Sequence, residues 1–202
     1  MAVDILKHNN VSLSMNPKKF ALWLFVVSII MIFAALTSAY IVRQAEGNWL
    51  DFDLPTIFWT STFVLLSSSI TMHLAYLNAK KNLISKTNSF LYLTSILGFC
   101  FLIMQFLGWK DLVNRPKLNG IDLNVYFAGP QSNPAGSFLY VLSGLHGFHI
   151  ICGLFFLLIV VLQSIKGKVN SNSILSIELC TTFWHFLDAL WLYLFLFLFL
   201  NR

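Results

Sequence analysis

The sequence has few charged residues. They make up 10% of the 202 residues, against roughly a quarter in an average soluble domain. Hydrophobic residues make up 57% of the chain. This balance argues against an ordinary soluble domain and indicates a protein of the membrane.

The chain is also poor in the residues and motifs of common catalytic and cofactor sites. Its three cysteines, Cys100, Cys152 and Cys180, lie in three separate apolar runs, and none forms a C-x-x-C pair. Their spacing predicts neither disulfides nor an iron–sulfur cluster. No G-x-G-x-x-G, P-loop or G-x-S-x-G motif occurs. We therefore expect the function to reside within the membrane.

Five apolar runs are long enough to cross a bilayer. A helix rises about 1.5 Å per residue and the hydrocarbon core is about 30 Å thick, so about twenty residues suffice. The runs cover residues 20–42, 56–78, 90–109, 138–163 and 179–200. Because they lack the period-two alternation of barrel strands, we predict an all-α fold. Residues 1–202 would then form one integral membrane bundle of five transmembrane helices.

The basic residues predict the orientation of this bundle. One side would carry Lys7, Lys18, Lys19, Lys80, Lys81, Lys86, Lys166 and Lys168, and the other Arg43, Lys110, Arg115, Lys117 and Arg202. This bias places the N-terminus inside and the C-terminus outside. The first apolar run is too long for a cleavable signal peptide and should remain a helix. Topology thus accounts for the net charge of +5, which does not indicate a nucleic-acid partner.

Ionisable side chains inside the apolar runs are costly and need an explanation. They are His73, His146, His149, His185 and Asp188, with Glu178 at the inner start of the last run. By helical spacing, His146 shares a face with His149, and Glu178 shares one with His185 and, more loosely, Asp188. His149 and His185 both fall near mid-membrane and could meet if the last two helices pack together. A short connection makes those helices expected neighbours.

Three interpretations of these polar residues compete. Buried imidazole is a common metal or haem ligand, but only His185-x-x-Asp188 resembles a di-metal bundle element, in reversed order. A proton relay is the second, although Glu178, His185 and Asp188 span only about 15 Å, half of the bilayer. The third, which we favour, is structural and assigns no metal. Polar contacts between helices or to lipid would be made by His146, His149, Glu178, His185 and Asp188, each worth about 0.6 to 2 kcal/mol.

Small residues in the fourth run predict close helix packing. Ser143 and Gly147 form a small-x-x-x-small pair, with Gly144 beside them and Gly153 further along. Such residues allow the backbone of another helix to approach. We expect these four positions to be packing sites.

Two motifs resemble those of a known family. The stretch S-G-L-H-G-F-H-I-I-C-G-L at residues 143–154 is similar to the H-G-x-H-x-x-x-G helix of subunit III of haem–copper oxidases. Glu178 followed by F-W-H-F-L-D-A-L-W-L-Y-L-F at residues 183–195 resembles the last helix of that family. The first run, with F-V-V-S-I-I-M-I-F-A at residues 25–34, also looks like a family helix. The resemblance covers most of the chain, in matching order.

The resemblance implies an accessory role in aerobic respiration. Subunit III of a cytochrome c or quinol oxidase holds no haem or copper and has no catalytic residues of its own. It steadies the catalytic subunit I, supports proton uptake during oxygen reduction and holds structural phospholipid. The expected partners are therefore subunits I and II, which carry the cofactors, and membrane lipids. The five predicted helices resemble a short bacterial form of subunit III, which would lie in the bacterial inner membrane.

One departure keeps other functions open. Many family members carry a glutamate where Ile29 follows Ser28 in this chain, so no role of that acid can be transferred. The departure favours, as an alternative, the subunit-III-like accessory protein of a nitric oxide reductase. A small transporter would need broken helices around a midplane site, and a cytochrome b-type anchor would need paired haem-ligating histidines.

Overall fold

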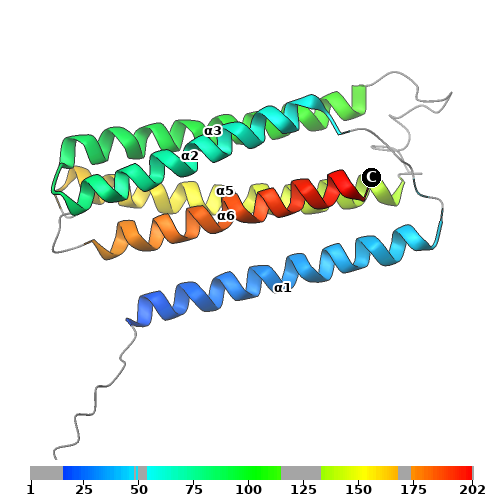
Figure 1. Cartoon of the computed structure of the whole chain (residues 1–202), viewed down its shortest axis with the longest axis horizontal. Coiled ribbons are helices and arrows are strands. Elements are labelled where there is room, and N and C mark those ends of the chain that lie inside the picture. Colours follow the sequence, from blue (N-terminus) through cyan, green and yellow to red (C-terminus); the bar gives the residue numbers. More distant parts are fainter. Residues whose placement is uncertain (1–15, 48, 50–53, 115–132, 168–173, 202) are drawn as a thin grey trace, which may run out of the picture.

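Five long helices make up the computed structural model, which describes residues 16–47, 49, 54–114, 133–167 and 174–201. They are α1 (Pro17–Ala45), α2 (Thr56–Lys80), α3 (Ile84–Asn114), α5 (Pro134–Ile165) and α6 (Leu175–Leu200) (Figure 1). No strand occurs in these ranges. Each helix is long and apolar enough to cross a membrane. The predicted all-α class with five membrane-spanning helices is confirmed, and each predicted run lies inside one helix.

Most helices extend beyond the apolar runs, and capping side chains set the starts of α1 and α5. The Asn16 side chain accepts a hydrogen bond from the Lys18 amide at 3.0 Å, and Asn133 does the same for Ala135. In both cases a proline follows the asparagine at the first helical position, where its missing N–H is not needed. Past the end of α5, Gly167 adopts a φ of +66°, a backbone conformation that suits glycine.

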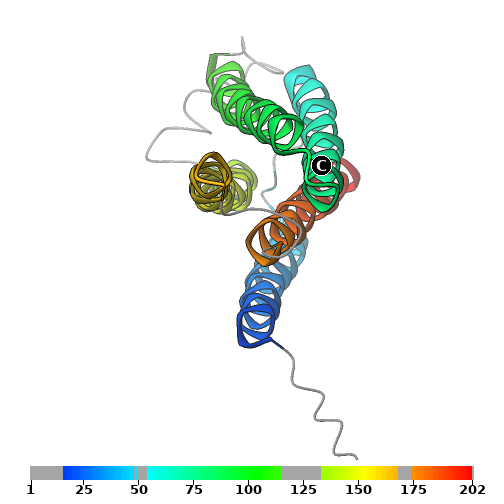
Figure 2. The same cartoon turned by 90° about the vertical axis from the view of Figure 1, so that its left-hand side faces the viewer.

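Four helices form the body of the bundle. Neighbours α2 and α3 run side by side, α5 packs on α3, and α6 packs on both α5 and α2. Within the described residues, α1 contacts only α5 and α6. Figure 2 accordingly shows α1 at the edge of the molecule, next to α6. The first helix is therefore the least embedded of the five.

Burial follows this arrangement. In the most apolar 18-residue stretch of α6, 50% of the residues are buried, whereas in the corresponding stretch of α1 only 22% are buried. The buried residues of α1 form one stripe: Val26, Ile29, Phe33, Thr37 and Tyr40. The exposed residues of all the helices are mainly large and apolar. Such a surface suits a bilayer as solvent, because lipid tails are as apolar as the side chains they meet.

The orientation in the membrane remains a prediction. Several of the basic residues that carry it lie outside the described residues: Lys7, Arg115, Lys117, Lys168 and Arg202. Among those that are described, Lys18, Lys19 and Lys80 lie at the same end of the bundle as the start of α6 (Figure 1).

Close helix approach occurs at glycines that differ in part from the predicted ones. A Cβ atom on Gly153 would lie 3.1 Å from Leu187 Cδ1, whereas one on Gly147 would lie 3.9 Å from its nearest neighbour. The tightest sites are both on α3. A Cβ on Gly98 would lie 2.8 Å from the ring of Trp184, and one on Gly108 would lie 2.4 Å from Phe58. The sequence analysis did not single out Gly98 or Gly108.

These contacts predict that Gly98→Ala destabilises the bundle. The new methyl group would push into the indole of Trp184, a fully buried ring that packing prevents from moving aside. Overpacking of this kind costs about 1–3 kcal/mol. The free energy of unfolding in detergent micelles measures the effect, with Gly147→Ala as the matched control. Equal stability of the two variants would contradict the packing described.

Candidate functional site: polar contacts among the membrane helices

Two indole groups attach α6 to α2. Trp184 Nε1 donates a hydrogen bond to Ser68 Oγ at 3.0 Å, and Trp191 Nε1 donates one to Thr62 Oγ1 at 3.0 Å. All four residues are buried. The two tryptophans are seven residues apart and so lie on one face of α6. They satisfy their polar atoms inside the bundle, as a group buried in apolar surroundings must.

A third contact between these helices involves His185. Its Nδ1 atom lies 2.6 Å from the Ser69 hydroxyl, and its ring centroid lies 5.9 Å from that of His73. Asp188 lies one turn further along α6 and is 3% exposed. Neither oxygen of its carboxylate has a hydrogen-bond partner among the described residues. His185 is thus directed towards α2, and Asp188 shares a face of α6 with Trp184 and Trp191, which also contact α2.

The two histidines of α5 have different surroundings. His146 is 1% exposed and packs between the rings of Phe101 and Trp191, with centroids 5.9 and 5.1 Å away. His149 Nδ1 lies 2.7 Å from the Leu145 carbonyl oxygen, to which it donates, and its ring packs 5.9 Å from Phe33 of α1. The structure therefore directs His149 towards α1 and His185 towards α2.

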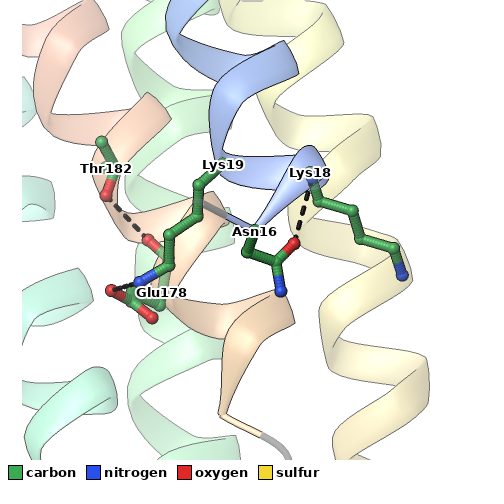
Figure 3. A network of polar contacts seen from close by, with 5 residues as sticks. All are labelled: Asn16, Lys18, Lys19, Glu178 and Thr182. Carbon is green, nitrogen blue, oxygen red and sulfur yellow. Dashed lines mark hydrogen bonds and ion pairs between the residues drawn. The ribbon is translucent and has the colours of Figure 1, made fainter. Parts of the chain in front are cut away.

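Glu178 joins α6 to the start of α1. Its Oε1 atom lies 2.6 Å from Lys19 Nζ, and both side chains are partly exposed (Figure 3). The Thr182 hydroxyl donates to the Glu178 carbonyl oxygen one turn later, at 2.9 Å. Lys19 had entered the sequence analysis only as a topology signal. A lysine immediately before one apolar run and a glutamate immediately before another would have been the signal for this pair.

The opposite end of α1 is also attached to α6. The Asn201 carbonyl oxygen accepts hydrogen bonds from Tyr40 Oη at 2.8 Å and from Gln44 Nε2 at 3.1 Å. Between the two ends, Tyr193 Oη donates to Thr37 Oγ1 at 3.1 Å. Polar contacts along its length thus supplement the small apolar contact that α1 makes with the bundle.

The predicted packing residues of α5 lie close to α3 and α6. Ser143 is buried and accepts a hydrogen bond from Trp109 Nε1 at 3.1 Å. The ring of Trp109 also lies nearest to Gly144, 3.7 Å from a Cβ placed there. Gly153 lies beneath Leu187 and Trp184 of α6.

Within the described parts of the chain, no three His, Cys, Asp or Glu side chains come together in a way that could hold a metal ion. His149 instead lies against α1, His146 among aromatic rings, and His185 beside His73 of α2. The hydroxyl partners on α2 were missed by the sequence analysis. The run Ser67-Ser68-Ser69 in an apolar segment was the available signal for them.

Comparison with known proteins identifies the family. Residues 6–201 match the family described as cytochrome c oxidase subunit III. The chain belongs to this family. Among similar proteins are the cytochrome bo(3) ubiquinol oxidase subunits 3 of two Buchnera aphidicola strains. That of the strain from Acyrthosiphon pisum is 32% identical, covering 94% of this chain and 89% of its own. That of the strain from Schizaphis graminum is 29% identical, covering 92% and 95%.

A cytochrome c oxidase subunit 3 from Thermostichus vulcanus is 26% identical, covering 86% of this chain and 82% of its own. The resemblance drawn from the two motifs is thereby confirmed. The chain is a subunit III of the haem–copper oxidase type, an accessory subunit that belongs to a cofactor-free family. Its five helices and its bacterial relatives make it a multi-pass protein of the bacterial inner membrane.

The W-H-F-x-D-x-x-W pattern of this subunit III has a direct structural explanation. Both tryptophans donate to hydroxyl groups of α2, and His185 contacts Ser69 between them along the same helix. The spacing of the pattern is therefore the spacing at which α6 meets α2. The residues that identify the last helix are those that position it.

We predict that Ser68→Ala destabilises this subunit III, whereas Ser67→Ala does not. The first change leaves the buried Trp184 N–H without its acceptor, and such interhelical bonds in membranes are worth about 0.6 to 2 kcal/mol. The second removes an exposed hydroxyl that bonds only within its own helix, to the Phe63 carbonyl oxygen. Unfolding of the two purified variants in the same detergent compares them. Equal free energies of unfolding would show that the indole bond contributes nothing.

Proposed function

We propose that this chain assembles with the catalytic subunit I and with subunit II of a haem–copper terminal oxidase. It steadies the catalytic subunit and supports proton uptake during oxygen reduction, while the haems and copper belong to its partners. The observation that carries this proposal is the use of the α6 signature within the bundle. Trp184, His185 and Trp191 all contact α2, which favours a structural over a catalytic use.

The distribution of the other polar groups supports the same proposal over a transporter or a relay contained in this chain. Each described helix is continuous, whereas transporter sites are typically built on broken helices. Glu178 pairs with α1 and His185 with α2, so these two residues face different neighbours. A proton path through this chain alone would need them to be joined.

An apolar pocket offers a place for a structural phospholipid. It has a volume of about 260 Å³ and lies between α1 and α6, lined by Ile30, Phe33, Ala34, Leu190 and Tyr193. Along α1 it lies between the Lys19–Glu178 ion pair and the contacts of Tyr40 and Gln44 with Asn201. We propose that part of a phospholipid acyl chain occupies this pocket, because its lining is apolar and open to the membrane.

The assembly is tested by affinity purification of the tagged chain from mild detergent. We expect haem-containing oxidase subunits to be recovered with it, and the chain separated from them to show no Soret band. The alternative assembly is distinguished by the haem type, because recovery with a haem b-only nitric oxide reductase would replace the oxidase proposal. A Soret band in the separated chain would overturn the accessory role itself.

The lipid proposal predicts that Ala34→Leu lowers the phospholipid content of the purified complex. The larger side chain fills the pocket between α1 and α6. Ala35→Leu is the matched control, since Ala35 is exposed and does not line the pocket. Native mass spectrometry counts the lipids bound to each variant. Unchanged lipid binding by Ala34→Leu would remove this pocket from the proposal.

A further inference from the structure

A polar surface on the outside of the bundle, around the His185–Ser69 contact, has no role in the contacts proposed so far with other subunits. Ser69 and His73 lie one turn apart on α2, and His185 and Ala189 lie one turn apart on α6. We call these four residues the α2–α6 face. We propose that the α2–α6 face binds a transmembrane helix of another oxidase subunit that presents a hydrogen-bond acceptor. This proposal rests on the oxidase assembly proposed above.

The geometry of the α2–α6 face leaves hydrogen-bonding groups available to a neighbour. The Ser69 hydroxyl contacts Nδ1 of His185, which leaves Nε2 of the same ring for a contact outside the bundle. The exposed His73 makes ring contacts with His185 and Tyr76, at centroid distances of 5.9 and 6.5 Å. Ser69 and His185 are half-buried, and Ala189 is exposed. Two imidazoles therefore lie together at the outer surface.

The depth of this face makes lipid tails an unfavourable neighbour. The end of α2 at Lys80 and the Lys19–Glu178 ion pair mark the polar end of the bundle. His73 is seven residues from Lys80, and His185 is seven residues from Glu178, so each lies about 10 Å deeper by helical rise. Polar side chains at membrane depth typically face protein or water rather than lipid.

The chemistry of the groups then selects the occupant. An acyl chain offers no acceptor to an imidazole N–H, and a head-group phosphate would have to sink about 10 Å below the polar end to reach one. A protein helix can place a carboxylate, hydroxyl or amide oxygen at this depth without that cost. A protein helix is therefore the occupant that the chemistry favours.

The surroundings of the face leave room for such a helix. Within the described residues α1 does not contact α2, although both lie against α6 (Figures 1 and 2). Ala189 is a small residue at which another backbone can approach closely. Ile70, next to Ser69, is 64% exposed and adds apolar contact area. The face thus combines three polar side chains with a close-approach site and an apolar border.

Site-specific photocrosslinking in the intact oxidase tests the proposal. A benzophenone amino acid replaces Ala189 on the α2–α6 face or, as control, Phe99 of α3, which is 62% exposed and lies outside that face. We expect position 189 to crosslink to another oxidase subunit and position 99 to give no such product. Crosslinks from position 189 to phospholipid alone, or to a second copy of this chain, would overturn the proposal.

A second measurement uses His73→Leu, with Tyr92→Leu of α3 as an exposed control. We expect His73→Leu to lower retention of this chain in the purified oxidase by about threefold or more, the effect of losing one interhelical polar contact. Because His73 is exposed, the unfolding of the isolated chain should not change. If the His73→Leu chain were fully retained in the purified oxidase, the proposal for the α2–α6 face would fail, while the proposed assembly with the oxidase would stand. If the unmodified chain purified without any oxidase subunit, the proposed function itself would fail.

Discussion

The contact between α6 and α2 is the constraint on which the rest of the structure depends. A tryptophan N–H buried in a membrane bundle has no water to bond, so it must meet an acceptor on a neighbouring helix. Trp184 and Trp191 meet Ser68 and Thr62, and these two bonds determine how α6 is rotated against α2. That rotation places the Trp184 ring against Gly98 and the Trp191 ring against His146. The packing of α3 and α5 therefore follows from the same two bonds.

This view assigns the family signature a structural role within an accessory subunit. Of the polar residues that first invite a catalytic interpretation, Glu178 and His185 join helices, and His146 fills space among aromatic rings. The edge helix α1 depends more on polar contacts than the other helices do, because contacts at its two ends supplement a narrow apolar stripe. An attachment of this kind leaves the apolar pocket between α1 and α6 open for lipid. In our account the subunit supplies shape and surfaces, and the oxygen chemistry takes place in its partners.

Much of the fold could be predicted from the sequence, because membrane helices must satisfy their own backbone and therefore appear as long apolar runs. The helix ends could not be placed by hydropathy alone, since Asn16 and Asn133 begin α1 and α5 outside those runs. Spacing along one helix indicated which polar residues share a face, but not which neighbour each would meet. His149 and His185 lie at similar depths, yet the rotation of their helices directs them to α1 and α2. The partners Ser68, Thr62 and Lys19 are small or common residues whose role depends on a second helix.

A double-mutant cycle on Trp191→Phe and Thr62→Val tests the central claim most directly. The cycle cancels the packing changes that each substitution causes alone and isolates the energy of the indole–hydroxyl bond. The account predicts a coupling energy of about 0.6 to 2 kcal/mol in the free energy of unfolding of the purified subunit. Additive effects of the two substitutions, with no coupling, would contradict the claim that this bond holds α6 against α2.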